Sequence, residues 1–123
     1  GWTWLTESGP AANGSLVGQR FPNYDGFLLG FSEKVTLRPG TLIDRYGVEA
    51  GRFLAPQGTP FSARGLPAAA ADAPYAVYEV VQPLEVTAGI AAPAFGQPGM
   101  GIQYMTASSV ADLLEAGYLR LAP

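Results

Sequence analysis

The sequence contains no cysteine and no histidine, and only 14% of its 123 residues are charged. Without cysteine there is no disulfide framework, no thiolate nucleophile and no zinc site with cysteine ligands, and without histidine the usual imidazole base and metal ligand are missing as well. We therefore expect no metal site. Long apolar runs are also missing, because none reaches the length that spans a bilayer, so we predict no membrane segment.

Basic residues are few, and they are scattered along the chain. Lysine and arginine number 7 against 10 acidic residues, which gives a net charge of −3. A nucleic-acid-binding domain gathers its basic residues on one face, so we predict no nucleic-acid partner. Apolar residues make up 48% of the chain, enough for one core at this length. We expect one monomeric domain over residues 23–123, preceded by an irregular segment over 1–22 that is either a lid or a linker remnant.

Glycine and proline are abundant, with 16 and 11 residues, and they separate short stretches rich in β-branched and aromatic residues. This composition favours short strands joined by tight turns over long helices. The strongest strand signal is "YAVYEVV" at 75–81, which we predict to be a central strand. The other predicted strands are 33–37, 41–43, 52–54, 84–89, 102–106 and an edge strand within 118–121.

One segment differs in kind from these strands. In "SSVADLLEAG", residues 108–117, Ser109 lies three residues before Asp112 in the pattern of a helix cap, and Gly117 follows as a stop signal. This pattern predicts one short C-terminal helix. Earlier in the chain, Asp25 and Gly26 are typical of a tight turn with positive backbone torsions, and "AAAADA" at 68–73 is most simply a surface connection.

The glycine-rich stretch "AFGQPGMGIQYM", residues 94–105, allows two interpretations. Clusters of glycine and proline mostly form turns, so taken alone it favours a structural loop. A glycine-rich backbone can also approach a phosphate or sugar closely and form an anion-binding nest. The pattern is neither a Walker loop nor a dinucleotide fingerprint, since it precedes a strand and lacks the following lysine.

The arginines divide into two groups by their context. For Arg45, which follows Asp44, the simplest interpretation is a local surface ion pair of little energetic value, and Arg52 and Arg120 are interpreted as surface residues. Arg45 and Arg64 nevertheless lie beside turns and aromatic residues, where a guanidinium could clamp a phosphate while a ring stacks on a flat heterocycle. These two positions suggest a site for a nucleotide.

Five motifs occur in this order along the chain: "NYDGF", "PGTLIDRYG", "GRFLAPQGTPFSARGLP", "YAVYEV" and "APAFGQPGMGIQY". Together they resemble the catalytic domain of the tuberculosis necrotizing toxin family of NAD glycohydrolases, found at the ends of bacterial toxins and in fungal surface NADases. The resemblance implies an α+β domain with a mixed, mostly antiparallel β-sheet. It also implies hydrolysis of NAD+, and often NADP+, with no cofactor beyond the substrate. A domain of this kind is secreted or delivered within a larger toxin, acts in the target-cell cytosol and can have a cognate immunity protein.

The resemblance also assigns site residues. Arg45, Arg64 and Gln103 fall on the family's two arginines and its essential glutamine, and are the predicted catalytic residues. Phe53 falls on a family aromatic, and Phe27 is a looser match to an aromatic near the nicotinamide. The other predicted substrate contacts are Tyr75, Gly99 and Gly101.

One position departs from the family pattern, because Ala76 stands where the founding toxin has histidine. Departing nicotinamide is neutral and needs no proton, so we expect the chain to be active without that histidine. Two alternatives stay open. An ADP-ribosyltransferase would use the same dinucleotide, although the Glu-x-Glu or Gln-x-Glu triplet of such toxins is missing; a catalytically silent NAD-binding module would also fit. Calcium dependence, known in fungal relatives, has no clear ligand cluster here, and we predict none.

Overall fold

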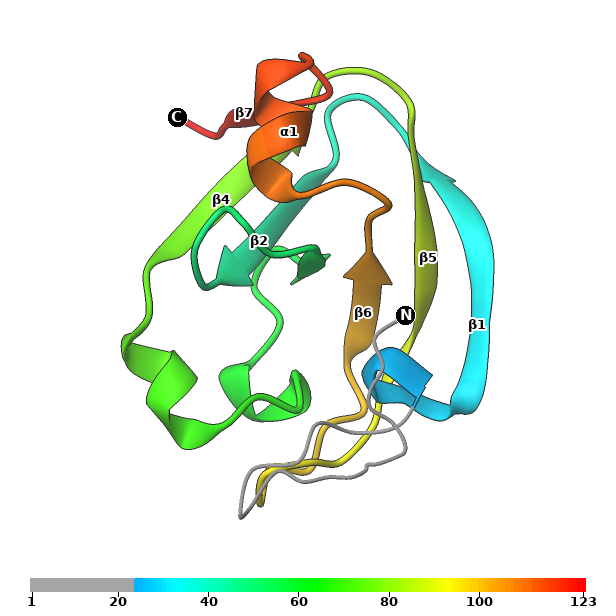
Figure 1. Ribbon diagram of the computed structural model, residues 1–123, viewed down its shortest axis with the longest axis vertical. Helices are drawn as coiled ribbons and strands as arrows, with labels where there is room; N and C mark the ends of the chain where they lie inside the picture. The colour runs from blue at the N-terminus through cyan, green and yellow to red at the C-terminus, as the bar shows by residue number, and fades with distance from the viewer. Residues whose placement is uncertain (1–23) are drawn as a thin grey trace.

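The computed structural model describes residues 24–123, which form a seven-stranded sheet with the order β1-β5-β6-β3-β2-β4-β7 (Figure 1). The strands are β1 Phe27–Leu37, β2 Leu42–Tyr46, β3 Phe53–Pro56, β4 Tyr75–Val80, β5 Leu84–Ala91, β6 Ile102–Met105 and β7 Leu119–Leu121. All six pairings are antiparallel. The expected α+β domain with a mostly antiparallel sheet is therefore confirmed. The predicted irregular segment at 1–22 lies outside the described residues.

The strongest strand signal of the sequence forms β4, which pairs with β2 on one side and β7 on the other. Within it Tyr78 and Val80 are buried, at 1% and 0% exposure, because alternate residues of a strand face the same side of the sheet. The segment is thus paired along both edges, as predicted, although only β7 separates it from the end of the sheet.

The first strand is longer than its predicted range. It begins at Phe27, and its register against β5 shifts between Phe27 and Ser32, where Leu29 and Gly30 have positive φ values of 55° and 74°. This irregularity breaks the alternation of side chains, so only the regular half, 33–37, was visible in the sequence. Short 3-10 helices also occur where loops were expected: η1 at Tyr24–Gly26, η2 at Phe61–Ala63 and η3 at Ala68–Asp72.

The helix α1, Val110–Glu115, forms as predicted and covers the core at one end of the sheet (Figure 1). The Ser109 hydroxyl accepts a hydrogen bond of 3.1 Å from the backbone N–H of Asp112, and Gly117 follows with φ +84°. Val110 and Leu113 contribute to the core. The other buried members of that core are Leu37, Ile43, Leu54, Tyr78, Val80, Leu84, Val86 and Leu119. None of the helices within 24–123 has the length and apolar character to cross a membrane.

The short strand β3 joins the two halves of the sheet, since it pairs with β2 on one side and β6 on the other. Near β3, segments from distant parts of the chain come together: the loop after η2, the end of β5 and the start of β6. Their meeting point is where the pocket of the molecule lies.

Candidate active site

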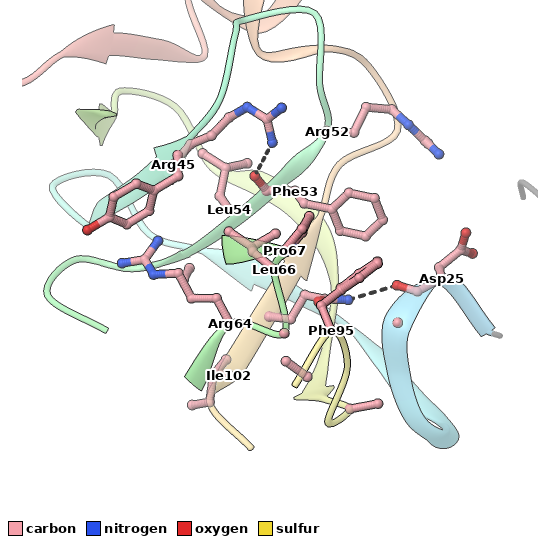
Figure 2. A pocket seen from close by; sticks show the side chains of 17 residues that line it. Asp25, Arg45, Arg52, Phe53, Leu54, Arg64, Leu66, Pro67, Phe95 and Ile102 are labelled. Carbon is pink, nitrogen blue, oxygen red and sulfur yellow. Dashed lines mark hydrogen bonds between the residues drawn. The ribbon is translucent and has the colours of Figure 1, made fainter. Parts of the chain in front are cut away.

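A pocket of about 430 Å³ lies between the ends of β2 and β3, the loop after η2 and the start of β6 (Figure 2). This volume is in the range of about 300–1,000 Å³ that is usual for small-molecule sites. Four of the predicted site residues line it: Arg45, Phe53, Arg64 and Gln103. The sheet therefore brings together side chains that are far apart in the sequence, since Arg45 and Gln103 are separated by 58 positions.

Gln103 enters the pocket from β6, where it pairs with Gly89 of β5. Its Nε2 donates a hydrogen bond of 2.9 Å to the backbone carbonyl of Asp25, at the beginning of the described chain (Figure 2). Because Gln103 lies on a strand and has a fixed partner, its carboxamide is held in place before any ligand binds.

Arg45 is held at the pocket wall by two backbone carbonyls. Its Nε donates to Val48 and its Nη1 to Phe53, both at 2.8 Å. A Cβ at Gly51 would come within 1.9 Å of Arg45 Nη2, so only glycine leaves room for the guanidinium. Within residues 24–123 no carboxylate forms an ion pair with Arg45, and burial lowers the pKa of its guanidinium. Among the described residues, the positive charge of Arg45 at the pocket wall therefore has no carboxylate partner.

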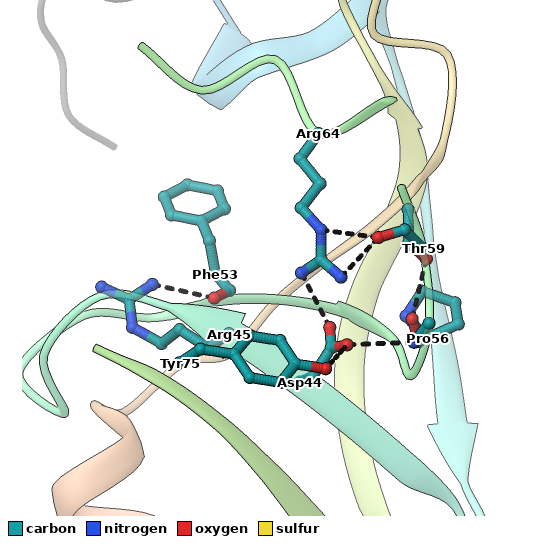
Figure 3. A network of polar contacts seen from close by, with 8 residues as sticks. Asp44, Arg45, Phe53, Pro56, Thr59, Arg64 and Tyr75 are labelled. Carbon is teal, nitrogen blue, oxygen red and sulfur yellow. Dashed lines mark hydrogen bonds and ion pairs between the residues drawn. The ribbon is translucent and has the colours of Figure 1, made fainter. Parts of the chain in front are cut away.

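Arg64, in contrast, is committed to the fold (Figure 3). Its Nη1 lies 2.7 Å from Oδ1 of Asp44, and the two side chains are only 7% and 0% exposed. Its Nε and Nη2 donate to the carbonyl of Thr59 at 3.0 and 2.7 Å, and its guanidinium lies 4.8 Å from the centre of the Tyr46 ring. Because all three nitrogens have protein partners, Arg64 is poorly placed to clamp a phosphate. It instead ties the loop 57–66 to β2.

This arrangement corrects the local ion pair that the sequence suggested between Asp44 and Arg45. Neighbouring residues of a strand point to opposite faces of the sheet, so Asp44 and Arg45 cannot face each other from β2. Asp44 pairs with Arg64, twenty positions further along the chain.

Tyr75 contacts the same network from its solvent side, at 47% exposure, and does not belong to the described lining of the pocket. Its hydroxyl donates a hydrogen bond of 2.7 Å to Oδ2 of Asp44, which also accepts one of 3.0 Å from the N–H of Gly58 (Figure 3). The hydrogen bond to Asp44, together with partial burial and the negative charge nearby, raises the pKa of Tyr75 to about 12. Its ring lies 4.8 Å from that of Tyr46, which does line the pocket.

Three other predicted substrate contacts are not brought into the lining of the pocket. Phe27 is 3% exposed and packs against Gly89, where a Cβ would meet its ring at 2.6 Å. Gly99 and Gly101 pack against their own chain, because a Cβ on either would come within 2.7 and 2.9 Å of a backbone carbonyl. In this structure the glycines of the loop allow the backbone to pack against itself, which is the structural interpretation that the sequence left open.

The pocket is also lined by residues that the sequence did not indicate as site residues, among them Arg52 and Phe95. Arg52, taken from the sequence as a surface residue, donates from Nη1 to the carbonyl of Thr106 at 3.1 Å. Phe95 has a positive φ of 53° in the glycine-rich loop. The sequence signals for these two lining residues were weak: Phe95 belongs to the motif "APAFGQPG", and Arg52 directly precedes Phe53.

Asp25 is the one acidic side chain among the described residues that line the pocket. Burial raises the pKa of its carboxyl, and the positive charge of Arg52 acts in the opposite direction. Among residues 24–123 no three acidic side chains converge as metal ligands would.

Ala76, the position of the family histidine, pairs directly with Arg45 across β4 and β2. Side chains of directly opposed residues lie on the same face of a sheet. Ala76 packs against the core, and it does not belong to the described lining of the pocket.

Comparison with known proteins agrees with this architecture. Residues 36–122 match the family model of the tuberculosis necrotizing toxin. The chain belongs to the tuberculosis necrotizing toxin family. The resemblance identified from the motifs is therefore confirmed, and it extends over most of the described sheet.

Among curated proteins, this member of the necrotizing toxin family is similar to the conidial surface nicotinamide adenine dinucleotide glycohydrolase nadA of Aspergillus fumigatus. The two are 38% identical over an alignment of 129 positions, which covers 95% of this chain and 53% of the fungal protein. The chain thus spans about half the length of that relative.

Solved structures of the necrotizing toxin fold give a consistent result. The tuberculosis necrotizing toxin, solved with its immunity factor, superposes with a TM-score of 0.66 at 26% identity, covering 84% of this chain and 63% of that chain. Rhs1-CT, solved with its cognate immunity protein, gives a TM-score of 0.52 at 16% identity, covering 75% of this chain and 77% of that chain. The second likeness shows the fold alone.

Proposed function

We propose that this chain hydrolyses NAD+, and also NADP+, to nicotinamide and ADP-ribose. The observation that carries the proposal is one pocket that joins the unneutralised cation of Arg45, the ring of Phe53 and the oriented carboxamide of Gln103. The name of the 38% identical fungal relative, a nicotinamide adenine dinucleotide glycohydrolase, supports the same chemistry.

The reaction needs no acid to expel the leaving group. The bond between the ribose anomeric carbon and the pyridinium nitrogen breaks, and its electron pair neutralises the positive charge of that nitrogen. Water then bonds to the anomeric carbon and loses one proton to the solvent. The transition state resembles an oxocarbenium ion, so catalysis depends on positioning and electrostatics. A pocket without histidine can supply both.

Four of the pocket residues have a task in this reaction. Arg45 attracts the diphosphate, because its charge has no carboxylate partner among the described residues. Phe53 gives the nicotinamide a flat apolar surface, and Gln103 contacts the attacking water or a ribose hydroxyl. Arg64 acts indirectly, since its contacts to Asp44 and Thr59 fix the loop that forms one wall.

We further propose that the domain acts as a toxin that depletes the dinucleotide pool in the cytosol of a target cell, after secretion or delivery within a larger protein. Two of the similar structures were solved with immunity proteins, which supports a cognate immunity protein as a partner here.

Incubation of the purified chain with NAD+ labelled on its adenosine, with and without a cell lysate as a source of acceptor proteins, tests the proposal. Hydrolysis gives free nicotinamide and labelled ADP-ribose in equal amounts. A transferase gives free nicotinamide with label on an acceptor protein, and a binding module gives neither product. Either of the last two results would overturn the proposed hydrolase activity.

A further inference from the structure

The carboxamide of Gln103 has only one orientation that satisfies its hydrogen bond. Its partner is the carbonyl oxygen of Asp25 at 2.9 Å, and a carbonyl can only accept (Figure 2). The NH₂ group must therefore face Asp25. The oxygen Oε1 is left as the end of the side chain that can serve a ligand, and it can only accept a hydrogen bond.

The carbonyl of Asp25 is itself oriented by unusual backbone torsions. The peptide plane that carries it lies between ψ of Asp25, 29°, and φ of Gly26, +81°. Aspartate tolerates its own positive φ of 55°, but few residues other than glycine and asparagine adopt the value at position 26. A residue that prefers negative φ at position 26 would rotate this peptide plane and turn the carbonyl away from Gln103.

Two further contacts fix this turn, Asp25–Gly26, to the sheet next to Gln103. The carbonyl of Gly26 accepts a hydrogen bond of 2.7 Å from the N–H of Ala92. Directly after it, the buried ring of Phe27 packs on Gly89, the residue that pairs with Gln103 in β5 and β6. Phe27 therefore anchors the turn against the backbone that also carries the glutamine.

We propose that the turn Asp25–Gly26 is a positioning device, which holds the carboxamide of Gln103 so that Oε1 accepts a hydrogen bond from the reacting water or ribose hydroxyl. An acceptor draws the proton side of water toward itself and leaves the oxygen lone pair directed at the anomeric carbon. A flipped amide would offer N–H donors instead and compete for that lone pair. This inference rests on the proposed hydrolysis for its functional part.

Three variants distinguish an effect on the orientation of the Gln103 carboxamide from an effect on the stability of the fold. Gly26→Ala introduces strain at φ +81°, with its Cβ in ordinary contact with Gln103 at 3.5 Å. Gly40→Ala introduces similar strain at φ +94° in a turn where no described atom lies within 4 Å of the new Cβ. Gly26→Asn adds a larger side chain that nevertheless tolerates positive φ. The readouts are Tm, kcat and KM for NAD+, and proton exchange of the Gln103 side-chain amide observed by NMR.

We expect both alanine variants to lower Tm by similar amounts, but only Gly26→Ala to lower kcat, by about tenfold to 100-fold, with KM changed by less than about threefold. Gly26→Asn should retain more activity than Gly26→Ala in spite of its size. In the unmodified chain the Gln103 amide protons should exchange at least about tenfold more slowly than those of the exposed Gln57, and Gly26→Ala should remove the difference.

Equal kcat values for Gly26→Ala and Gly40→Ala would overturn the positioning role. The positioning role would also be overturned if the side-chain amide protons of Gln103 exchange as fast as those of Gln57 in the unmodified chain. This measurement does not require Gly26→Ala to fold. If the unmodified chain releases no nicotinamide while Gln103 is protected, the proposed hydrolysis fails and the oriented amide stands.

Discussion

Two arginine–carboxylate pairs among residues 24–123 allow a direct test of what burial does to an ion pair. Arg64 with Asp44 and Arg120 with Glu79 have the same N–O distance of 2.7 Å. The first pair is 7% and 0% exposed, and the second is 62% and 25% exposed. The same substitution, arginine to methionine, can be made in both.

Arg64→Met leaves the carboxylate of Asp44 buried with two donors from the described part of the chain, the N–H of Gly58 and the hydroxyl of Tyr75. Removing one partner of a buried pair costs about 3–5 kcal/mol, against a total stability of about 5–15 kcal/mol for a domain. Arg120→Met removes an exposed pair and should cost about 1 kcal/mol or less. We therefore expect a fall in Tm of at least ~12 °C for Arg64→Met and of at most ~8 °C for Arg120→Met.

Urea unfolding followed by circular dichroism measures both losses on the same scale. If Arg64→Met lowers the free energy of unfolding no more than Arg120→Met does, the network in Figure 3 does not tie the loop 57–66 to the sheet, and burial does not strengthen the pair of Arg64 and Asp44.

Four further substitutions test the pocket and the residues around it. Gln103→Ala should lower kcat by ~100-fold or more while Tm changes little, as measured by nicotinamide release and thermal unfolding. Arg45→Lys keeps the charge but loses the planar fork, so it should reduce kcat/KM for NAD+ more than Arg120→Lys does, and equal effects would contradict a phosphate contact. The raised pKa of Tyr75 implies stability that is complete below pH 10 and lost as the pH rises toward about 12, because ionisation removes the donated hydrogen bond. Tyr75→Phe should weaken this dependence without abolishing it, because burial also raises the pKa of Tyr78 and Tyr104, and the phenol of Tyr75 can be followed by NMR. Ala76→His should change the rate by about tenfold or less, and a chain that binds NAD+ but turns over only after this substitution would show that our mechanism omits an essential group.

Much of the fold was predictable because its signals are local. The helix α1 follows from Ser109, which caps it, and from Gly117 after its end. The strand β4 follows from a dense run of β-branched and aromatic residues. The first half of β1 was missed because the positive φ values at Leu29 and Gly30 interrupt the alternation on which strand prediction depends.

The site was predictable only in part, since its members were assigned one at a time by motif. Arg45, Phe53 and Gln103 do meet in one pocket. The partner of Asp44 could not be read from spacing, because an ion pair across twenty residues depends on how the loop after β3 folds back. Phe27 illustrates the same limit: its motif suggested a ligand contact, whereas its surroundings make it a buried anchor.

Hydrolysis of NAD+ by this pocket transfers an oxygen atom from water to the ribose, and this transfer can be measured. The purified chain is incubated with NAD+ in water enriched in oxygen-18, and the ADP-ribose is analysed at once by mass spectrometry. Hydrolysis places one heavy oxygen at the anomeric carbon of the ADP-ribose and releases one nicotinamide for each, and Gln103→Ala should lose both products. Unchanged NAD+ after incubation with the folded chain, or equal product formation by Gln103→Ala, would contradict hydrolysis by this pocket.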